Sequence, residues 1–341
     1  MIKRNAKNER IKYDYLVLLK EARQRDQKSV DAIAAALDRF DKYNKYQDFK
    51  RFHYQQAIGF KKSLQKEKNQ NTGKPLSKAT LNSTLRHIKA FFQWLAEQQG
   101  FRSSIVATDA EYFNLSEKDV RTATASRPKR APTIQQVKHV ISLMPIGSDI
   151  EKRNRALVAF ILLTGARDKS VASLQLKHID LVSDSVFFDA REVETKFSKT
   201  FTTYFFPVGD EVRNIVADWV AYLRDELLFG LDDPLFPKTK LGKGKENVFE
   251  AQGLTREHWK TTTSIRDVFK QAFNDAGLIY YNPHSFRHLL SAMAQKTCKT
   301  VEEFKAWSQN LGHEGVLTTL YSYGEVQLER QGEIMDGLRV G

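Results

Sequence analysis

The sequence predicts a mainly α-helical protein of two domains, with a small antiparallel sheet in the second domain. Apolar residues recur at helical spacing through most of the chain. Two segments, 185–193 and 201–208, are instead rich in β-branched and aromatic residues and predict a β-hairpin. Charge also divides the chain: residues 1–130 hold 28 basic and 14 acidic side chains, whereas residues 131–341 hold 26 basic and 27 acidic. A strongly basic module before a near-neutral one predicts a nucleic-acid partner.

Length and composition restrict the class of protein further. A chain of 341 residues is long for one domain and suits two. Its 41% apolar and 28% charged residues are typical of a globular protein, and no apolar run approaches the roughly 20 residues that a transmembrane helix needs. No apolar segment follows the N-terminal MIKRNAKNER, so we expect no secretory signal. With Cys298 as the only cysteine, these features predict a protein of the reducing cytoplasm.

The basic module is expected to begin with three helices. Residues 8–24 and 29–43 show helical spacing of apolar residues, and Ser29 is a possible N-cap of the second helix. The apolar stripe of the second helix consists of Ile33, Leu37 and Phe40. A third helical segment is expected near 51–66.

A fourth helix is expected to begin at Ser77 and to end with Gly100 as its C-cap. Its apolar residues define an inner face: Leu81, Leu85, Ile88, Phe91, Phe92 and Leu95. Lys78, Arg86 and Lys89 lie on its other faces. We expect these three cations to contact a phosphate backbone.

The segment RTATASRPKRAP, residues 121–132, has the composition of a linker. It combines small residues, two prolines and four basic residues without apolar periodicity. We therefore expect a helical DNA-binding domain over 1–121, a basic linker over 122–132 and a second domain over 133–341. The linker cations could also lie along DNA: Arg127, Lys129 and Arg130.

The second domain is expected to start with two helices, 133–144 and 150–166, of which the latter is apolar along one side and ends at a glycine turn. Residues 171–181 are expected to continue as a helix that runs into a loop. The turn ETKFSKT joins the two hairpin strands. Helices are expected over 209–228 and again from about 264, with a mobile Gly/Lys-rich loop over 236–253 between them.

The motif HSFRHLL, residues 284–290, contains the residues best suited to chemistry. A zinc site is disfavoured because the metalloprotease pattern needs Glu after the first histidine, where this chain has Ser285. A purely structural alternative is that the histidines cap a helix after Pro283. The interpretation we favour is an anion site, because Arg287 offers a bidentate fork and His284 lies one helical turn before it.

Two further motifs could complete an anion site. TGARDKS places Arg167 just after a glycine turn, at a helix start where backbone N–H groups converge. LGHEGVLTTLYSYG, residues 311–324, supplies His313 together with Tyr321 and Tyr323.

These motifs, in this order, resemble the tyrosine recombinases, the phage-integrase-like site-specific DNA recombinases. LLTGARDKSVASLQLKHID is similar to the first arginine box of that family, HSFRHLLSAMA to its His-x-x-Arg-His box and LGHEGVLTTLYSYG to its Leu-Gly-His box. SKATLNSTLRHIKAFFQWL is similar to the last helix of the family's core-binding domain. The resemblance implies a helical, SAM-like core-binding domain followed by an α+β catalytic domain of the DNA breaking-rejoining enzyme type.

The resemblance also implies a mechanism and its residues. A tyrosine attacks the scissile phosphodiester and leaves a 3′-phosphotyrosine link to DNA, without a metal, ATP or other cofactor. Arg167 and Arg287 would neutralise the transition-state charge, His284 and His313 would hydrogen-bond the phosphate and assist proton transfer, and His288 would support them from behind. A lysine of the hairpin turn would act as general acid. We favour Lys199, and Lys196 stays an alternative.

Two positions depart from the pattern of the family. An acidic residue usually stands three positions after the first arginine, where this chain has Ser170; Asp168 lies on another face of the helix. The nucleophile usually follows the Leu-Gly-His histidine by nine residues, where this chain has Ser322. We favour Tyr323, which precedes Gly324, over Tyr321.

The partners implied are duplex DNA sites and further copies of the chain, as a tetramer on DNA, with no membrane partner and with the cytoplasmic nucleoid as the place of action. The tail from Glu325 to Gly341 could dock on a neighbouring protomer or fold back on its own domain. Two other functions stay open: a type IB topoisomerase, which relaxes DNA with the same chemistry, and a DNA-binding relative without catalysis.

Overall fold

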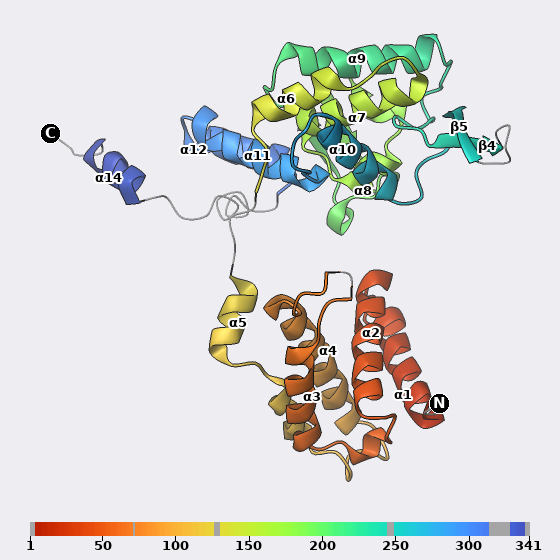
Figure 1. The fold of residues 1–341 in the computed structure, drawn as a ribbon, viewed down its shortest axis with the longest axis vertical. Helices are drawn as coiled ribbons and strands as arrows, with labels where there is room; N and C mark the ends of the chain where they lie inside the picture. The colour runs from red at the N-terminus through yellow and green to blue at the C-terminus, as the bar shows by residue number, and fades with distance from the viewer. Residues whose placement is uncertain (1–3, 71, 126–129, 244–248, 314–327, 338–341) are drawn as a thin grey trace. The chain divides into compact units, whose positions relative to one another are not determined.

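The computed structural model describes residues 4–70, 72–125, 130–243, 249–313 and 328–337. They divide into two units, Met1–Ala125 and Ser126–Gly341, and each is described by itself. Both units are mainly helical, and the second also holds small antiparallel sheets (Figure 1), which confirms the predicted fold class. Among the described residues, no helix has the length and apolar character needed to cross a membrane.

The first unit is a helical bundle (Figure 1). Its α-helices are α1 (Ala6–Val17), α2 (Gln27–Tyr43), α3 (Tyr54–Lys66), α4 (Lys78–Ala96) and α5 (Glu117–Thr124). A π-helical turn, Leu18–Ala22, extends α1, and 3-10 turns cover Phe49–Arg51 and Ala107–Phe113. The expected apolar stripes of α2 and α4 are buried, which is why these two helices pack against each other.

Phe40 lies at the centre of the first unit's core. Its ring contacts five other phenylalanine rings at centroid distances of 5.1–6.5 Å: Phe49, Phe52, Phe60, Phe92 and Phe113. Most of these contacts are edge-to-face, the geometry that the aromatic quadrupole favours. The core of this unit therefore depends on aromatic packing contributed by α2, α3, α4 and both 3-10 turns.

Helix ends in the first unit differ in part from the prediction. Ser77 caps α4 as expected, accepting from the backbone N–H of Thr80. The N-cap of α2 is Asp26, and the expected Ser29 instead donates its backbone N–H to the Asp26 carboxylate. Helix α4 ends at Ala96, before Gly100. An acidic N-cap is as favourable as serine, so sequence alone did not separate the two.

The second unit contains a longer series of helices. They are α6 (Ile134–Leu143), α7 (Asp149–Thr164), α8 (Asp168–Ser173), α9 (Asp210–Asp225), α10 (Thr263–Asp275), α11 (Pro283–Thr297), α12 (Val301–Asn310) and α14 (Leu328–Gly337). Helix α7 was expected to be apolar on one side. Instead, every residue of Ala156–Leu163 is buried, because neighbouring helices and strands surround α7.

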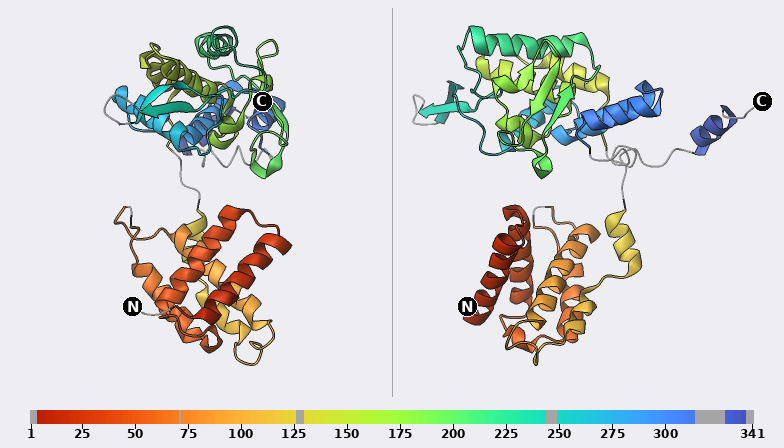
Figure 2. Two further views of the ribbon diagram at one scale, coloured as in Figure 1. Left: turned by 90° about the vertical axis from the view of Figure 1, so that its right-hand side faces the viewer. Right: turned by 180° about the vertical axis from the view of Figure 1, so that it is seen from behind.

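A three-stranded antiparallel sheet lies against these helices (Figure 2). It is formed by β1 (Ile179–Asp180), β2 (Ser185–Phe188) and β3 (Phe201–Tyr204) in that order. The predicted hairpin is confirmed, with Phe188 opposite Phe201 and their rings stacked at 4.9 Å. Short 3-10 turns cover Leu176–His178 and Lys196–Ser198.

Two local predictions in the second unit were wrong. Residues 171–181 do not continue as a helix, because α8 ends at Ser173 and the chain passes through the 3-10 turn into β1. The segment expected to be a loop over 236–253 contains a hairpin of β4 (Thr239–Lys243) and β5 (Phe249–Leu254). Glycine and lysine are poor strand formers, and cross-strand pairing overrides that local preference.

Candidate active site

Arg167 is presented by a sharp turn between two helices. Helix α7 ends where Gly165 takes a left-handed conformation, with φ of +61°. A side chain there would meet Leu311 and Leu290 at 2.9–3.0 Å, so only glycine fits. Arg167 then forms the N-cap position of α8 and is half-buried.

The guanidinium of Arg167 makes no hydrogen bond or ion pair within the described part of the chain. Burial lowers its pKa from the usual range. Its neighbour Asp168 is bound to Arg266 of α10 at 2.8–3.0 Å and does not neutralise it. A half-buried guanidinium without an acidic partner among the described residues favours an anionic ligand.

Helix α11 carries the HSFRHLL motif. Asn282 caps its start by accepting from the backbone N–H of Ser285, and Pro283 occupies the first helical position. The structural alternative, in which the histidines are the caps, is therefore wrong. His284 is exposed, and its ring meets that of His288 edge-to-face at 4.9 Å.

Arg287 is buried, with only 4% of its surface exposed, and joins three segments. Its Nη1 donates to the carbonyl oxygen of Gly165 at 2.6 Å. Its Nη2 donates to the carbonyl oxygen of Leu311 at 2.5 Å and to Nε2 of His313 at 3.0 Å. Burial, and then the positive charge of Arg167, lower the pKa of Arg287 to about 9. The two arginines that are far apart in sequence thus lie within electrostatic range of each other.

His313 lies at the centre of this cluster. Because arginine can only donate, the Nε2 atom that faces Arg287 must be an acceptor, so the ring is neutral with its proton on Nδ1. Burial and the positive charges of Arg287, Arg167, His284 and Lys199 lower the pKa of His313 to about 3. All four of these side chains are basic. A cluster of basic groups is suited to binding an anion.

The two hairpin lysines differ in their surroundings. Lys196 is exposed and its Nζ lies over the ring of Phe197 at 4.7 Å. Lys199 is half-buried, and its charge is among those that lower the pKa of His313. The structure therefore brings Lys199 near the histidine, while Lys196 packs on the surface of the turn.

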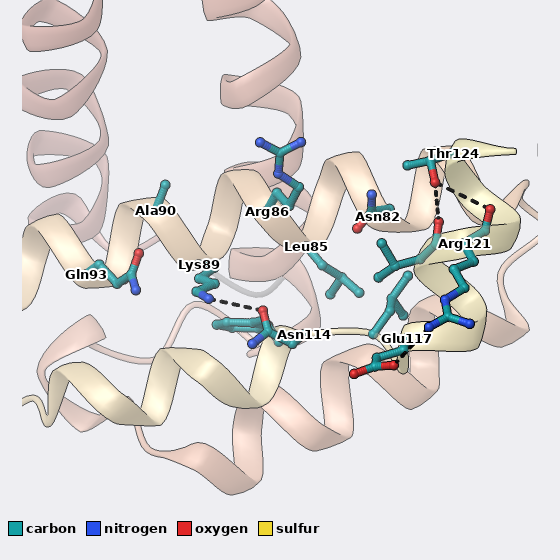
Figure 3. Close-up of a pocket in the computed structure, with 13 residues that line it drawn as sticks. Asn82, Leu85, Arg86, Lys89, Ala90, Gln93, Asn114, Glu117, Arg121 and Thr124 are labelled. Atoms are coloured by element: carbon teal, nitrogen blue, oxygen red, sulfur yellow. Dashed lines mark hydrogen bonds and ion pairs between the residues drawn. The ribbon is translucent and has the colours of Figure 1, made fainter.

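Two of the three expected DNA-contacting cations of α4, Arg86 and Lys89, line a groove of about 880 Å³ between α4 and α5 (Figure 3). Lys89 pairs with Glu111 at 2.6 Å, and Lys78 pairs with Asp119 at 2.9 Å. Arg86 is exposed and has no ion pair within the described residues. Of the three, Arg86 thus has its charge most available to a partner.

Several expected site residues lie outside the described residues: Arg127, Lys129, Tyr321 and Tyr323. The remaining linker cation, Arg130, is described and exposed.

Comparison with known proteins shows which family this chain belongs to. A family model described as the phage integrase family matches residues 133–329, more than half of the chain. The chain belongs to the phage integrase family. The resemblance to tyrosine recombinases is thereby confirmed, and neither a type IB topoisomerase nor an inactive DNA-binding relative is favoured by the similarities.

Two relatives of this integrase-family chain are bacterial tyrosine recombinases named XerC. That of Lactobacillus delbrueckii subsp. bulgaricus is 24% identical over 262 residues, which cover 75% of this chain and 76% of the relative. That of Escherichia coli O1:K1 / APEC is 27% identical over 265 residues, which cover 74% and 72%.

Solved structures share the fold of this integrase-family chain. A XerH recombinase bound to a palindromic difH substrate has a TM-score of 0.63 at 16% identity, covering 94% of this chain and 82% of that one. The Tn1549 transposon integrase with transposon right end DNA has a TM-score of 0.62 at 14% identity, covering 96% and 99%. A lambda integrase dimer bound to a core site has a TM-score of 0.61 at 11% identity, covering 94% and 99%.

Sequence reasoning missed one residue that shapes the site of this integrase-family chain. Asn310, directly before the Leu-Gly-His motif, accepts the backbone N–H of Tyr204 at 2.7 Å and donates to the Tyr204 carbonyl oxygen at 2.8 Å. Its own carbonyl oxygen accepts from the hydroxyl of Thr203. Asn310 thus continues the sheet beyond β3, and no sequence signal identifies a side chain that pairs with a strand edge.

Proposed function

We propose that this chain cleaves and rejoins duplex DNA at specific sites through a 3′-phosphotyrosine intermediate. The observation that carries the proposal is the gathering of Arg167, Arg287, His284 and Lys199 around a neutral His313. A phosphodiester is an anion, and its pentacoordinate transition state carries more negative charge on the non-bridging oxygens. Preorganised basic groups stabilise such a state more than they stabilise the substrate.

Arg167 and Arg287 would have different roles in this reaction. Arg167 has its whole fork available to the non-bridging oxygens within the described structure. Arg287 uses three of its N–H groups on Gly165, Leu311 and His313, so at most two can reach the phosphate. We therefore assign Arg167 to bind the phosphate and Arg287 to bind it while also holding His313 in place.

The histidines would manage protons and hydrogen bonds. His284 is exposed at the start of α11 and would donate to a non-bridging oxygen, with His288 supporting its ring from behind. The Nε2 lone pair of His313 already accepts from Arg287, so His313 would donate from Nδ1 to the phosphate, and His284 would accept the proton that the attacking tyrosine gives up. A bound phosphate would offset the surrounding positive charge and so raise the pKa of His313 from its low value.

Lys199 would be the general acid. Cleavage breaks the bond between phosphorus and the 5′-oxygen, and that oxygen needs a proton to leave as an alcohol. The electrostatic effect of Lys199 on His313 supports Lys199 over the exposed Lys196. The nucleophile is assigned to Tyr323, with Tyr321 as the alternative.

The first unit would supply most of the attraction to the phosphate backbone. We assign residues 1–121 to DNA binding, 122–132 to a basic linker and 133–341 to catalysis. The cations proposed to contact DNA are Lys78, Arg86, Lys89, Arg127, Lys129 and Arg130. We also propose that recombination needs a tetramer of this chain on two DNA sites, with the tail after Tyr323 as the segment that joins protomers.

A covalent trap tests the proposal. The protein is incubated with a library of nicked random-sequence duplexes, and DNA that stays attached to protein in denaturing detergent is sequenced. Wild type is expected to select one family of sequences. Tyr323→Phe should give no adduct, whereas Tyr321→Phe and the matched control Tyr13→Phe, an exposed tyrosine of the first unit, should keep it.

The outcomes separate the function from the choice of nucleophile. No adduct from wild type contradicts the proposed function. An adduct that survives Tyr323→Phe but is lost in Tyr321→Phe moves the nucleophile to Tyr321 and leaves the function standing.

A further inference from the structure

Helix α8 holds the segment that carries Lys199. The hydroxyl of Ser170 donates to the carbonyl oxygen of Glu194 at 3.0 Å, and the hydroxyl oxygen of Ser173 accepts the backbone N–H of Glu194 at 2.9 Å. Both backbone polar groups of Glu194 are therefore bound to serines of one short helix. The Lys169–Glu194 ion pair, 2.8 Å long, joins two exposed side chains and adds little.

The other end of the same segment is fixed by β3. Phe201 pairs with β2 and stacks on Phe188, and its ring packs where a side chain on Gly312 would meet it at 2.9 Å. Asn310, three residues before His313 in the chain, binds the outer edge of β3. The chain between Glu194 and Phe201 therefore has both ends fixed to elements that carry site residues.

The turn between these fixed ends is itself constrained. Phe197 and Ser198 adopt positive φ values of 61° and 49°, a conformation that residues with side chains rarely take. The hydroxyl of Thr200 accepts the backbone N–H of Ala190, which ties the turn to the end of β2. A turn held in this way sets the direction in which Lys199 leaves the backbone.

We propose that Ser170 and Ser173 are positioning residues for Lys199. Their hydrogen bonds hold Glu194 against α8, the helix that starts at Arg167. They thereby fix the distance between the Lys199 ammonium, which protonates the leaving oxygen, and the Arg167 guanidinium, which binds the phosphate. The inference rests on the proposed function, in which Lys199 is the general acid. It assigns a role to Ser170, which stands where the tyrosine recombinases usually have an acidic residue.

A change of leaving group tests this. In the reaction proposed above, the tyrosine oxygen bonds to phosphorus, the bond to the 5′-oxygen breaks and that oxygen takes a proton from Lys199. With sulfur in place of the 5′-oxygen, the phosphorus–sulfur bond breaks and a thiolate leaves without a proton, because thiols have a pKa of about 8.5. The sulfur substrate therefore bypasses the general acid but still needs Arg167 and Arg287.

The experiment compares rates of adduct formation on two duplexes of the sequence selected in the covalent trap, one with oxygen and one with sulfur at the scissile position. We expect Ser170→Ala and Ser173→Ala to slow the oxygen substrate at least about tenfold, since a general acid contributes roughly 10²–10⁴-fold, and to leave the sulfur substrate near the wild-type rate. Ser173→Thr, which keeps a hydroxyl, should retain the wild-type rate on both.

The controls separate this inference from the function on which it rests. Ser142→Ala removes an exposed serine of α6 whose hydroxyl binds only within its own helix, and should change neither rate. Lys199→Ala should behave as the serine variants do.

Equal losses on both substrates, or no loss on oxygen, would overturn the positioning role while leaving recombination intact. If Lys199→Ala slows adduct formation and the sulfur substrate does not restore the rate, both the positioning role and the choice of Lys199 as general acid are overturned. Absence of any wild-type adduct would instead contradict the proposed function. If Ser170→Ala fails to fold, Ser173→Ala, at a half-buried position, tests the positioning role by itself.

Discussion

Arg287 donates from Nη2 to Nε2 of His313 across 3.0 Å, joining the second motif of the sequence to the third. The same guanidinium binds the carbonyl oxygen of Gly165, within the first motif. One buried side chain thus connects three motifs that span residues 165–313. The proposed phosphate site can form only when α7, α11 and the end of α12 are packed together.

This arrangement predicts that the two arginines differ in their effect on stability. Arg287→Lys should lower the free energy of unfolding by about 1–3 kcal/mol, because the buried carbonyl groups of Gly165 and Leu311 lose donors that fit them. Arg167→Lys should leave stability nearly unchanged, since its guanidinium binds no protein group among the described residues. Both should abolish the covalent adduct. Urea unfolding and the adduct assay check this, and equal destabilisation would contradict it.

Stability should also depend on pH through His313. Its pKa is about 3 in the folded protein and near 6.5 when unfolded, so the unfolded state binds the proton first as pH falls. This contribution to stability is fully present above pH 6.5 and is lost between about 6.5 and 3. His313→Gln should therefore flatten the fall in melting temperature over that window. A parallel curve for wild type and variant would show that His313 does not titrate as described.

The first unit should depend strongly on Phe40. Phe40→Ala removes a fully buried ring that contacts five others and should cost about 3–5 kcal/mol. The control Tyr13→Ala removes a ring that is 67% exposed and should cost much less. Hydrogen exchange measured by mass spectrometry can separate the two units, and protection should fall in α2, α3 and α4 only. Loss of protection in α7 as well would mean that the units fold together.

Salt dependence should identify the cation that faces DNA. Arg86→Ala is expected to weaken binding and to reduce the slope of log K against log salt by about 1, as loss of one phosphate contact does. Lys78→Ala should have a smaller effect, because Lys78 is already paired with Asp119. Lys42→Ala, at an exposed position of α2, is the matched control. Fluorescence anisotropy across a salt series gives the slopes, and identical slopes for all variants would refute the assignment.

The sequence by itself determined the fold class and the hairpin, and it named five residues that the structure places within electrostatic range of one another: Arg167, Lys199, His284, Arg287 and His313. These follow from local patterns: helical periodicity, β-branched and aromatic strands, and short motifs whose residue types suit an anion. Even the order of the motifs was sufficient to indicate the family, because each motif is contiguous in the chain.

Tertiary structure decided what depends on long-range contacts. The neutral state of His313 comes from burial and from basic groups on three separate segments, and no single segment encodes it. Ser170 was conspicuous in sequence only for not being acidic, and its partner Glu194 lies 24 positions away. The hairpin of β4 and β5 forms against the preference of its own residues because two strands satisfy each other's backbone groups. Local propensity cannot report such pairings, since their energies arise only when distant segments meet.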